Sequence, residues 1–298
     1  MNKRSERPIV VGLGEILWDL LPNGKQLGGA PANFASCAAA LGARGVVISR
    51  IGKDSLGREI LQRLAAMQLE RTYIDMDSDH PTGTVSVKLD ARGQAQYIIH
   101  ENAAWDFMLA NDELAALVAS ADALCVGTLA QRSPVSRDTI QRLLAATSPR
   151  CLRIFDINLR QHYFDAAVID RTLTQSNIFK LNDEEMPVVA KLLGMTGNPQ
   201  EIARQLFKRY PLRLIARTQG EKGSVLYSPD GVDEIPGQAI RVVDTVGAGD
   251  AFAAALAVGL LRGRAIPQAH QYAARVGAFV CTCAGATPQL PKEWSERF

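Results

Sequence analysis

The chain has 298 residues, of which 47% are hydrophobic and 21% are charged, and this composition excludes global disorder. Lys and Arg number 33 against 31 Asp and Glu, which leaves a formal net charge of +2, and no basic cluster stands out. The charge balance therefore gives no electrostatic reason to expect nucleic acid or an anionic membrane as a partner.

The sequence favours a cytoplasmic location. Its longest apolar run, residues 251–261, is too short for a membrane span, which needs about twenty residues. Glu15 and Asp19 interrupt the apolar stretch after the charged start, so a secretory leader is not expected. The five cysteines are scattered, mostly in apolar segments, and the histidines lack metal-ligand spacing. These features indicate reduced, buried thiols and no zinc site.

Short apolar runs and amphipathic stretches alternate along the chain. Strand patterns occupy residues 9–13, 46–51, 123–126, 152–157, 178–181 and 212–216. Helical patterns occupy residues 32–41, 56–67, 112–120, 136–146, 184–193 and 199–208. Continuously apolar strands are typical of buried parallel sheets. Their alternation with helices predicts one α/β domain over residues 1–298, with a doubly wound, mostly parallel sheet flanked by helices.

Two segments break this alternation. Residues 84–89 and 95–99 flank Asp90-Ala91-Arg92-Gly93 and alternate polar with apolar residues, which predicts a hairpin with one solvated face. Residues 16–21, ending at Pro22-Asn23-Gly24, resemble another strand of the same small sheet. We therefore expect a β-lid formed by residues of about 15–28 and 82–103, placed where ligands bind at the carboxyl ends of the strands.

The most informative stretch is Asp244-Thr245-Val246-Gly247-Ala248-Gly249-Asp250, which precedes the wholly apolar residues 251–261. A long apolar run predicts a buried helix, and the two glycines leave backbone N–H groups open to an anion at its start. Asp250 is then either the N-cap of this helix or a functional carboxylate. The two glycines, the buried helix and the nearby Asp244 together favour the functional interpretation.

An anion site beside a carboxylate suggests phosphoryl transfer to a hydroxyl group. The backbone donors would stabilise the transferring phosphoryl group while Asp250 accepts the proton of the attacking alcohol. No phosphate-binding motif of the form G-x-x-x-x-G-K-[ST] occurs. Gly12-Leu13-Gly14 follows a strand, but Leu17 stands where the dinucleotide-binding motif G-x-G-x-x-G has its third glycine. The match to this motif is therefore incomplete, which argues against an oxidoreductase.

Two of these motifs carry a family resemblance. Gly247-Ala248-Gly249-Asp250 resembles the C-terminal signature of the ribokinase-like (PfkB) carbohydrate kinases, and Gly28-Gly29-Ala30-Pro31-Ala32-Asn33 resembles their N-terminal signature. Both occur in the expected order, and the resemblance covers essentially the whole chain. It implies an ATP-dependent kinase acting on a small sugar or related hydroxyl compound, with Mg²⁺ and often a monovalent cation such as K⁺.

The resemblance also implies roles for individual residues. Asp250 would be the general base, with Gly247, Ala248 and Gly249 as the anion hole. The sugar would be bound by Asp19, Gly28, Gly29, Asn33, Trp105, Asn158, Arg160 and Asp250. The nucleotide would be bound by Asn182, Thr218, Gly220, Gly223, Gly247 and Gly249. Glu185 would hold Mg²⁺ through water, and Asp244 would border a monovalent-cation site.

Several of these residues also have a purely structural interpretation. Asp156 would either hold Arg160 for substrate or form an ion pair at a strand end. Acidic residues around Glu185 also suit a helix start. The segment 218–223 also fits an ordinary turn, and Trp105 also fits a lid residue that packs on the main domain.

The substrate expected from the resemblance is fructose. Gly14-Glu15, residues 29–33, residues 156–160 and Trp105-Asp106 are similar to the fructokinase branch. A 2-keto-3-deoxygluconate kinase is the alternative, with Arg132 or Arg160 as the partner of the substrate carboxylate. Another sugar or nucleoside kinase of the family, and a catalytically silent sugar- or nucleotide-binding sensor, also remain open. A homodimer through the lid is expected, because exposed strand edges are safer when paired.

Overall fold

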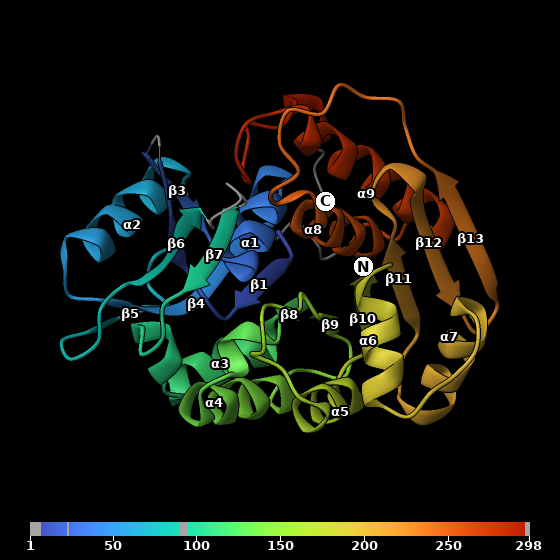
Figure 1. The fold of residues 1–298 in the computed structure, drawn as a ribbon, viewed down its shortest axis with the longest axis horizontal. Helices are drawn as coiled ribbons and strands as arrows, with labels where there is room; N and C mark the ends of the chain where they lie inside the picture. Colours follow the sequence, from blue (N-terminus) through green and yellow to red (C-terminus); the bar gives the residue numbers. More distant parts are fainter. Residues whose placement is uncertain (1–6, 23, 90–94, 296–298) are drawn as a thin grey trace, which may run out of the picture.

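The computed structural model describes residues 7–22, 24–89 and 95–295 (Figure 1). The strands of its large sheet are β1 (Ile9–Leu13), β4 (Arg44–Gly52), β5 (Ile74–Asp77), β8 (Ala123–Val126), β9 (Leu152–Asp156), β10 (Ile178–Asn182), β11 (Leu214–Thr218), β12 (Gly223–Ser228) and β13 (Gly231–Pro236). Their order is β13-β12-β11-β10-β9-β8-β1-β4-β5. Neighbouring strands from β11 to β5 are parallel, and β12 is antiparallel to both of its neighbours.

Helices cover both faces of this sheet (Figure 1). They are α1 (Ala30–Ala40), α2 (Ser55–Ala66), α3 (Asp112–Ser120), α4 (Pro134–Ala145), α5 (Ala166–Gln175), α6 (Glu185–Leu192), α7 (Pro199–Arg209), α8 (Ala248–Leu261) and α9 (Ile266–Cys281). Helices α1, α8 and α9 share one apolar core with the sheet, and α3 to α7 share the other. The predicted doubly wound, mostly parallel α/β sheet is confirmed.

Alternation along β9 and β10 determines which side chains reach α8. Ile154 and Ile178 belong to the core under α8, whereas Phe155 and Phe179 belong to the core on the opposite face. Because side chains in a strand alternate between faces, the residues two positions after Ile154 and Ile178 also face α8. The carboxyl ends of both strands therefore present a side chain to the start of that helix.

Helix α8 begins earlier than the apolar pattern predicts. Gly247 is its N-cap, with a left-handed backbone (φ 77°), and the helix starts at Ala248. Residues 251–259 are all buried, which explains the uninterrupted apolar run. The first turn of α8 therefore contains Gly249 and Asp250, and the core fixes the position of this turn.

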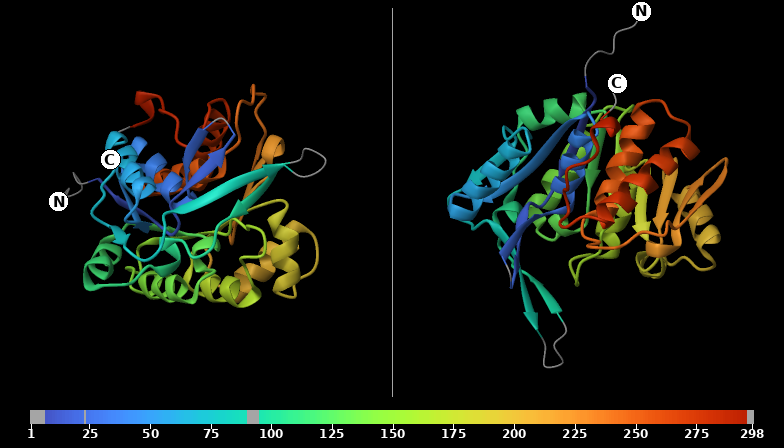
Figure 2. Two further views of the ribbon diagram at one scale, coloured as in Figure 1. Left: turned by 60° about the vertical axis from the view of Figure 1, so that its left-hand side comes forward. Right: turned by 90° about the horizontal axis from the view of Figure 1, so that it is seen from above.

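The small sheet has the order β3-β2-β6-β7, and its strands are β2 (Leu17–Leu21), β3 (Gly24–Gly28), β6 (Gly83–Leu89) and β7 (Ala95–Ile99). The two predicted segments thus form one sheet, and the β6–β7 hairpin extends away from the α/β body (Figure 2). The predicted turn at residues 90–93 and the central residue of the turn at 22–24 lie outside the described residues. None of the helices in the described ranges is long and apolar enough to cross a bilayer.

Candidate active site

Asp250 lies in the first turn of α8, where its carboxylate meets helix α1. The Asn33 side-chain amide donates a 2.8 Å hydrogen bond to Asp250 Oδ2. Because Gly247 is the N-cap, the interpretation of Asp250 as a capping residue is wrong. Burial raises the pKa of Asp250, and Lys180, the Asn33 hydrogen bond and Arg160 oppose this rise. The carboxylate is thus a basic group held in a fixed direction.

The start of α1 joins the small sheet to the body. Gly29, the N-cap of α1, has a positive φ of 109°, and a Cβ there would collide with the Glu15 carbonyl oxygen. A Cβ at Gly28 would likewise collide with the Asp19 carboxylate. The two glycines therefore permit the close approach of β2 to α1. This packing places Asp19 and Asn33 at one junction, as the sequence predicts.

Glu15 is a buried carboxyl group at this junction that the sequence analysis did not include in the site. Its side chain is 2% exposed, and Oε2 has no hydrogen-bond partner within the described ranges. Burial raises the pKa of Glu15 to about 7, and Asp250 contributes to the rise while Arg160 opposes it. The Gly14-Glu15 pair was the available signal, but a lone glutamate near a strand end does not indicate burial.

The loop after β9 brings a cation to these carboxylates. Asn158 has a left-handed backbone (φ 43°), and the exposed Arg160 follows it. Arg160 opposes the burial-driven rise in the pKa of Asp19, Glu15 and Asp250, so its positive charge acts on all three groups. The charge of the predicted residue Arg160 therefore acts on both the base and Asp19, and the contact of Asn158 with a sugar stays a prediction.

Asp156 does not hold Arg160, which corrects the functional interpretation of this pair. Lys180 Nζ instead donates a 2.9 Å hydrogen bond to Asp156 Oδ1, and the two residues are partners across β9 and β10. Burial raises the pKa of Asp156, and Lys180 opposes the rise. Burial alone would lower the pKa of Lys180, but the carboxylates around it raise the pKa above its ordinary value. Lys180 is thus a buried cation. The sequence did not indicate a role for it, because a single lysine does not change the apolar pattern of a strand.

Hydrogen bonds of Asn182 and Glu185 connect the end of β10 to the loop after β9. Asn182 Oδ1 accepts from the backbone N–H groups of Glu184 and Glu185 at 2.9 and 2.8 Å. The Glu185 carboxylate accepts from the backbone of Leu159 and Asn182 at 2.8 and 2.7 Å, one bond to each oxygen. Each oxygen keeps a second lone pair, which suits contact with a hydrated Mg²⁺. The described residues contain no group of three or more His, Cys, Asp or Glu that could hold a metal directly.

The predicted nucleotide-binding segment lies beside these residues. Thr218 is the register partner of Asn182 at the ends of β11 and β10. Gly220 and Gly223 have φ values of 57° and 103°, and a Cβ at Gly223 would meet the backbone of β13 and the residue after it. The short 3₁₀ helix Gly220–Lys222 lies between them. Both glycines are therefore required by the backbone, and their contact with a nucleotide stays a prediction.

Asp244 connects the loop before α8 with the loop after α9. Its Oδ1 accepts from the Val246 backbone at 3.0 Å, and its Oδ2 accepts from the Gly285 backbone at 3.1 Å. A Cβ at Gly247 would lie 2.6 Å from Ala286, so the two loops also touch there. The carboxylate thus organises this corner, and its role at a cation site stays a prediction.

Trp105 is packed inside the protein. Its side chain is fully buried, and the Arg132 guanidinium lies 4.1 Å from the ring centroid. Arg132 donates to the two oxygens of Asp106 at 2.8 and 2.7 Å. This arrangement matches the alternative interpretation of Trp105 as a packing residue, and its contact with a sugar stays a prediction.

Comparison with known proteins identifies the family. A model of the pfkB family carbohydrate kinases matches residues 23–293. The chain belongs to this family. The resemblance inferred from the two signatures is confirmed, and the protein is a pfkB carbohydrate kinase, a phosphotransferase with an alcohol acceptor.

Relatives of this pfkB kinase include fructokinases. The fructokinase of Klebsiella pneumoniae is 31% identical over 296 residues, which cover 94% of this chain and 95% of the relative. An uncharacterized sugar kinase from Pyrococcus horikoshii has a solved structure with a TM-score of 0.83 at 25% identity, covering 96% and 95% of the two chains. The fructokinase of Vibrio cholerae O395, solved with fructose, ADP and calcium ion, has a TM-score of 0.81 at 26% identity and 97% coverage of both chains.

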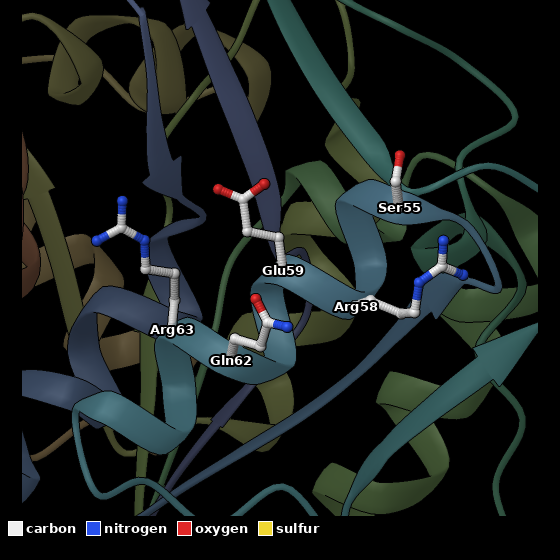
Figure 3. Close-up of a pocket in the computed structure, with 5 residues that line it drawn as sticks. All are labelled: Ser55, Arg58, Glu59, Gln62 and Arg63. Carbon is white, nitrogen blue, oxygen red and sulfur yellow. The ribbon is translucent and has the colours of Figure 1, made fainter.

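Two hollows lie on the surface of the described part of this pfkB kinase. One is lined by side chains that project from α2, namely Ser55, Arg58, Glu59, Gln62 and Arg63 (Figure 3). The other, with a volume of about 1110 Å³, lies between α1, the start of β4 and residues 286–290. The second hollow is also lined by Ala251, which directly follows Asp250, and by Ala286 and Thr287 of the loop after α9.

A Ser-His-Asp chain also lies outside the site. His270 Nε2 lies 2.8 Å from Ser224 Oγ, and His270 Nδ1 lies 2.5 Å from Asp233 Oδ2. Burial lowers the pKa of His270, and Asp233 opposes this. Ser224 and His270 are 4% and 0% exposed, so a substrate does not reach them. The three hydrogen-bonded side chains connect β12 and β13 to α9, and their burial does not suggest a second catalytic centre.

Proposed function

We propose that this kinase transfers the γ-phosphoryl group of ATP to a hydroxyl of fructose, with Asp250 as the general base. The observation that carries the proposal is the Asn33–Asp250 hydrogen bond. It joins the N-terminal and C-terminal signatures, although the two residues are 217 positions apart in sequence. A polar amide and a basic carboxylate from the two signatures thus form one surface for a sugar hydroxyl.

The chemistry follows from the start of α8. The attacking hydroxyl donates its proton to Asp250 as its oxygen bonds to the γ-phosphorus, and the bond to the ADP leaving oxygen breaks. Backbone N–H groups in the first turn of a helix have no partner within the helix, and the Ala248 N–H donates to the Thr245 carbonyl oxygen, so those of Gly249 and Asp250 are available to the phosphoryl oxygens. Asn33 holds the carboxylate toward the hydroxyl. Lys180 and Arg160 oppose its burial-driven rise in pKa and so favour the ionised base.

The nucleotide and its metal fit the neighbouring strand ends. Thr218, Gly220 and Gly223 would contact ATP, and Asp244 would border a monovalent-cation site. Glu185 would hold Mg²⁺ through water at the end of β10. When bound, Mg²⁺ supplies positive charge to the phosphate oxygens. Helix α8 contributes the positive end of its dipole to the same region.

The charges of the site favour a neutral sugar over 2-keto-3-deoxygluconate. Arg132 is neutralised by its two bonds to Asp106. The positive charge of Arg160 is partly offset by the carboxyl groups of Asp19 and Glu15, whose pKa values it lowers. The names of the relatives, several of which are fructokinases, point the same way. Asp19 and Asn33 instead offer an acceptor and an amide to sugar hydroxyls.

A coupled assay for ADP tests the proposal. The purified protein is incubated with ATP and Mg²⁺ and, in turn, with fructose, other neutral sugars, nucleosides and 2-keto-3-deoxygluconate. We expect the highest kcat/KM with fructose. Higher activity with 2-keto-3-deoxygluconate would contradict the substrate assignment, and sugar binding without ADP formation would identify a sensor.

The role of Asp250 is tested by Asp250→Asn. We expect nucleotide binding to persist while kcat falls at least about 100-fold, because only the proton acceptor is lost. Asp138→Asn, an exposed change on α4, is the matched control. A kcat near that of the control would refute the assignment of the base.

The small sheet supports a homodimer as a further part of the proposal. Its edge strands β3 and β7 each have a neighbour on one side within the sheet. A second copy of the chain could pair with such an edge. Sedimentation analysis of the purified protein would distinguish a dimer from a monomer.

A further inference from the structure

A buried ammonium group lies beside the first turn of α8. Lys180 faces α8 from the carboxyl end of β10, because Ile178, two positions earlier, belongs to the core under that helix. A Cβ built on Gly249 would lie 2.9 Å from Lys180 Nζ. The absence of a side chain at Gly249 therefore makes the room in which the ammonium group sits.

The ammonium group has unused hydrogen-bonding capacity. Lysine offers three N–H donors, and in the part of the chain that the structure describes Asp156 Oδ1 is the one acceptor bonded to Nζ. Lys180 and Asp156 are 7% and 4% exposed, so neither is solvated like a surface ion. Two donors remain for a group that enters beside Gly249.

Fold stability alone gives little reason for this pair. A buried ion pair is often no more stabilising than well-packed apolar residues of similar size. Elsewhere β9 and β10 contribute apolar residues to the core under α8, namely Ile154 and Ile178. The ion pair replaces that apolar pattern at the point where both strands end, next to Asp250. Its position thus points to a function at the site.

We propose that Lys180 binds the transferred phosphoryl group, donating to its non-bridging oxygens, and that Asp156 holds Lys180 in place. The inference rests on the proposed phosphate site at the start of α8. Negative charge spreads over the three equatorial oxygens during transfer, and a fixed cation in a dry site stabilises it. Lys180 keeps all its protons in this role.

The alternative is that the pair only fastens β9 to β10. Three variants separate the two roles: Lys180→Met, Asp156→Asn and the double variant Asp156→Asn/Lys180→Met. The double variant removes both charges, so neither group is left buried without a partner. Lys191→Met, an exposed lysine change on α6, is the matched control.

Steady-state kinetics give the first test. We expect Lys180→Met to lower kcat at least about 100-fold, the effect of losing one donor to a developing anion, with the sugar KM changed by less than about threefold. Asp156→Asn keeps the ammonium group and should lose less than about tenfold. The double variant should stay as slow as Lys180→Met even though its thermal midpoint returns toward wild type. A double variant with wild-type kcat would show that the ion pair only links β9 to β10.

Two further measurements isolate the phosphoryl contact. The loss in Lys180→Met should persist at about pH 9, because it does not arise from protonation of Asp250; recovery at that pH would overturn the proposal. ADP should bind wild type more tightly when aluminium fluoride and fructose are added as a phosphoryl mimic. Lys180→Met should lose at least about tenfold of this enhancement while binding ADP alone normally. An intact enhancement would refute the contact, whereas a wild-type protein inactive with every sugar would refute the proposed function instead.

Discussion

Gly247→Ala is expected to damage both the stability and the catalysis of this kinase. Gly247 has a φ of 77°, and a Cβ there would lie 2.6 Å from Cα, Cβ and the carbonyl oxygen of Ala286. Two of these atoms belong to the backbone, which cannot move aside as a flexible side chain would. Gly285 is in addition bonded to Asp244, so the loop after α9 resists displacement.

The magnitude follows from two separate effects. Placing alanine in a left-handed conformation costs about 1–2 kcal/mol, and overpacking a well-filled site costs about 1–3 kcal/mol. We therefore expect the free energy of unfolding to fall by about 2–5 kcal/mol. The collision also shifts the start of α8, and since a displacement of about 1 Å can cost about 100-fold in rate, kcat should fall by a similar factor.

Urea unfolding and steady-state kinetics test this reasoning, with Gly263→Ala as the matched control. Gly263 follows α8 and has a similar φ of 73°, but a Cβ there meets nothing within 4 Å. The control should lose only the conformational part, about 1–2 kcal/mol, and keep its kcat. Equal unfolding midpoints and equal kcat for the two variants would refute the steric argument.

Three further changes probe the same site. Gly249→Val should lower kcat, because the new Cβ would lie 2.9 Å from Lys180 Nζ and displace the ammonium group from Asp156; an unchanged kcat would contradict this. Asn33→Leu removes a hydrogen bond that lowers the pKa of Asp250, so the acid limb of the kcat/KM profile should move to higher pH, and an unmoved limb would argue against Asp250 as the base. Burial raises the pKa of Glu15 from 4.5 to about 7. Between these two pH values, Glu15 is therefore protonated in the folded state and ionised in the unfolded chain. Stability should fall as pH rises through this window, by up to about 3 kcal/mol, and Glu15→Gln should remove that part of the pH dependence in unfolding titrations.

The parts of the fold that the sequence predicted are those with a strong local pattern. Continuously apolar strands such as β1 and β8 are recognisable because both of their faces are buried. Strand β13 was not predicted, since most of its residues are exposed and it carries Asp233 and Glu234. Helix α9 was not predicted either. The polar residue His270 occupies a fully buried position in its first turns, so the apolar periodicity that would indicate a helix is weakened there. His270 is accommodated by Ser224 and Asp233, partners that only the folded chain supplies.

The candidate site divides in a similar way. Asn33 and Asp250 belong to motifs whose glycines mark close backbone approach, so they could be singled out from sequence. Glu15 and Lys180 could not, because a charged residue in a sequence is normally solvated. Their burial depends on partners from distant elements, such as Asp156 for Lys180 and the start of α1 for Glu15.

The same charge pattern limits what the kinase can accept. Around the base, the carboxyl groups of Asp19 and Asp250 and the partly ionised Glu15 outnumber the guanidinium of Arg160, and the charge of Lys180 is balanced by Asp156. A substrate carboxylate placed there would meet net negative charge in a partly desolvated region, which is unfavourable. A neutral sugar instead presents hydroxyl donors to these same oxygens. On the proposed substrate assignment, these carboxyl groups favour a sugar over a sugar acid, and Asp19→Asn should lower the ratio of kcat/KM for fructose to kcat/KM for 2-keto-3-deoxygluconate.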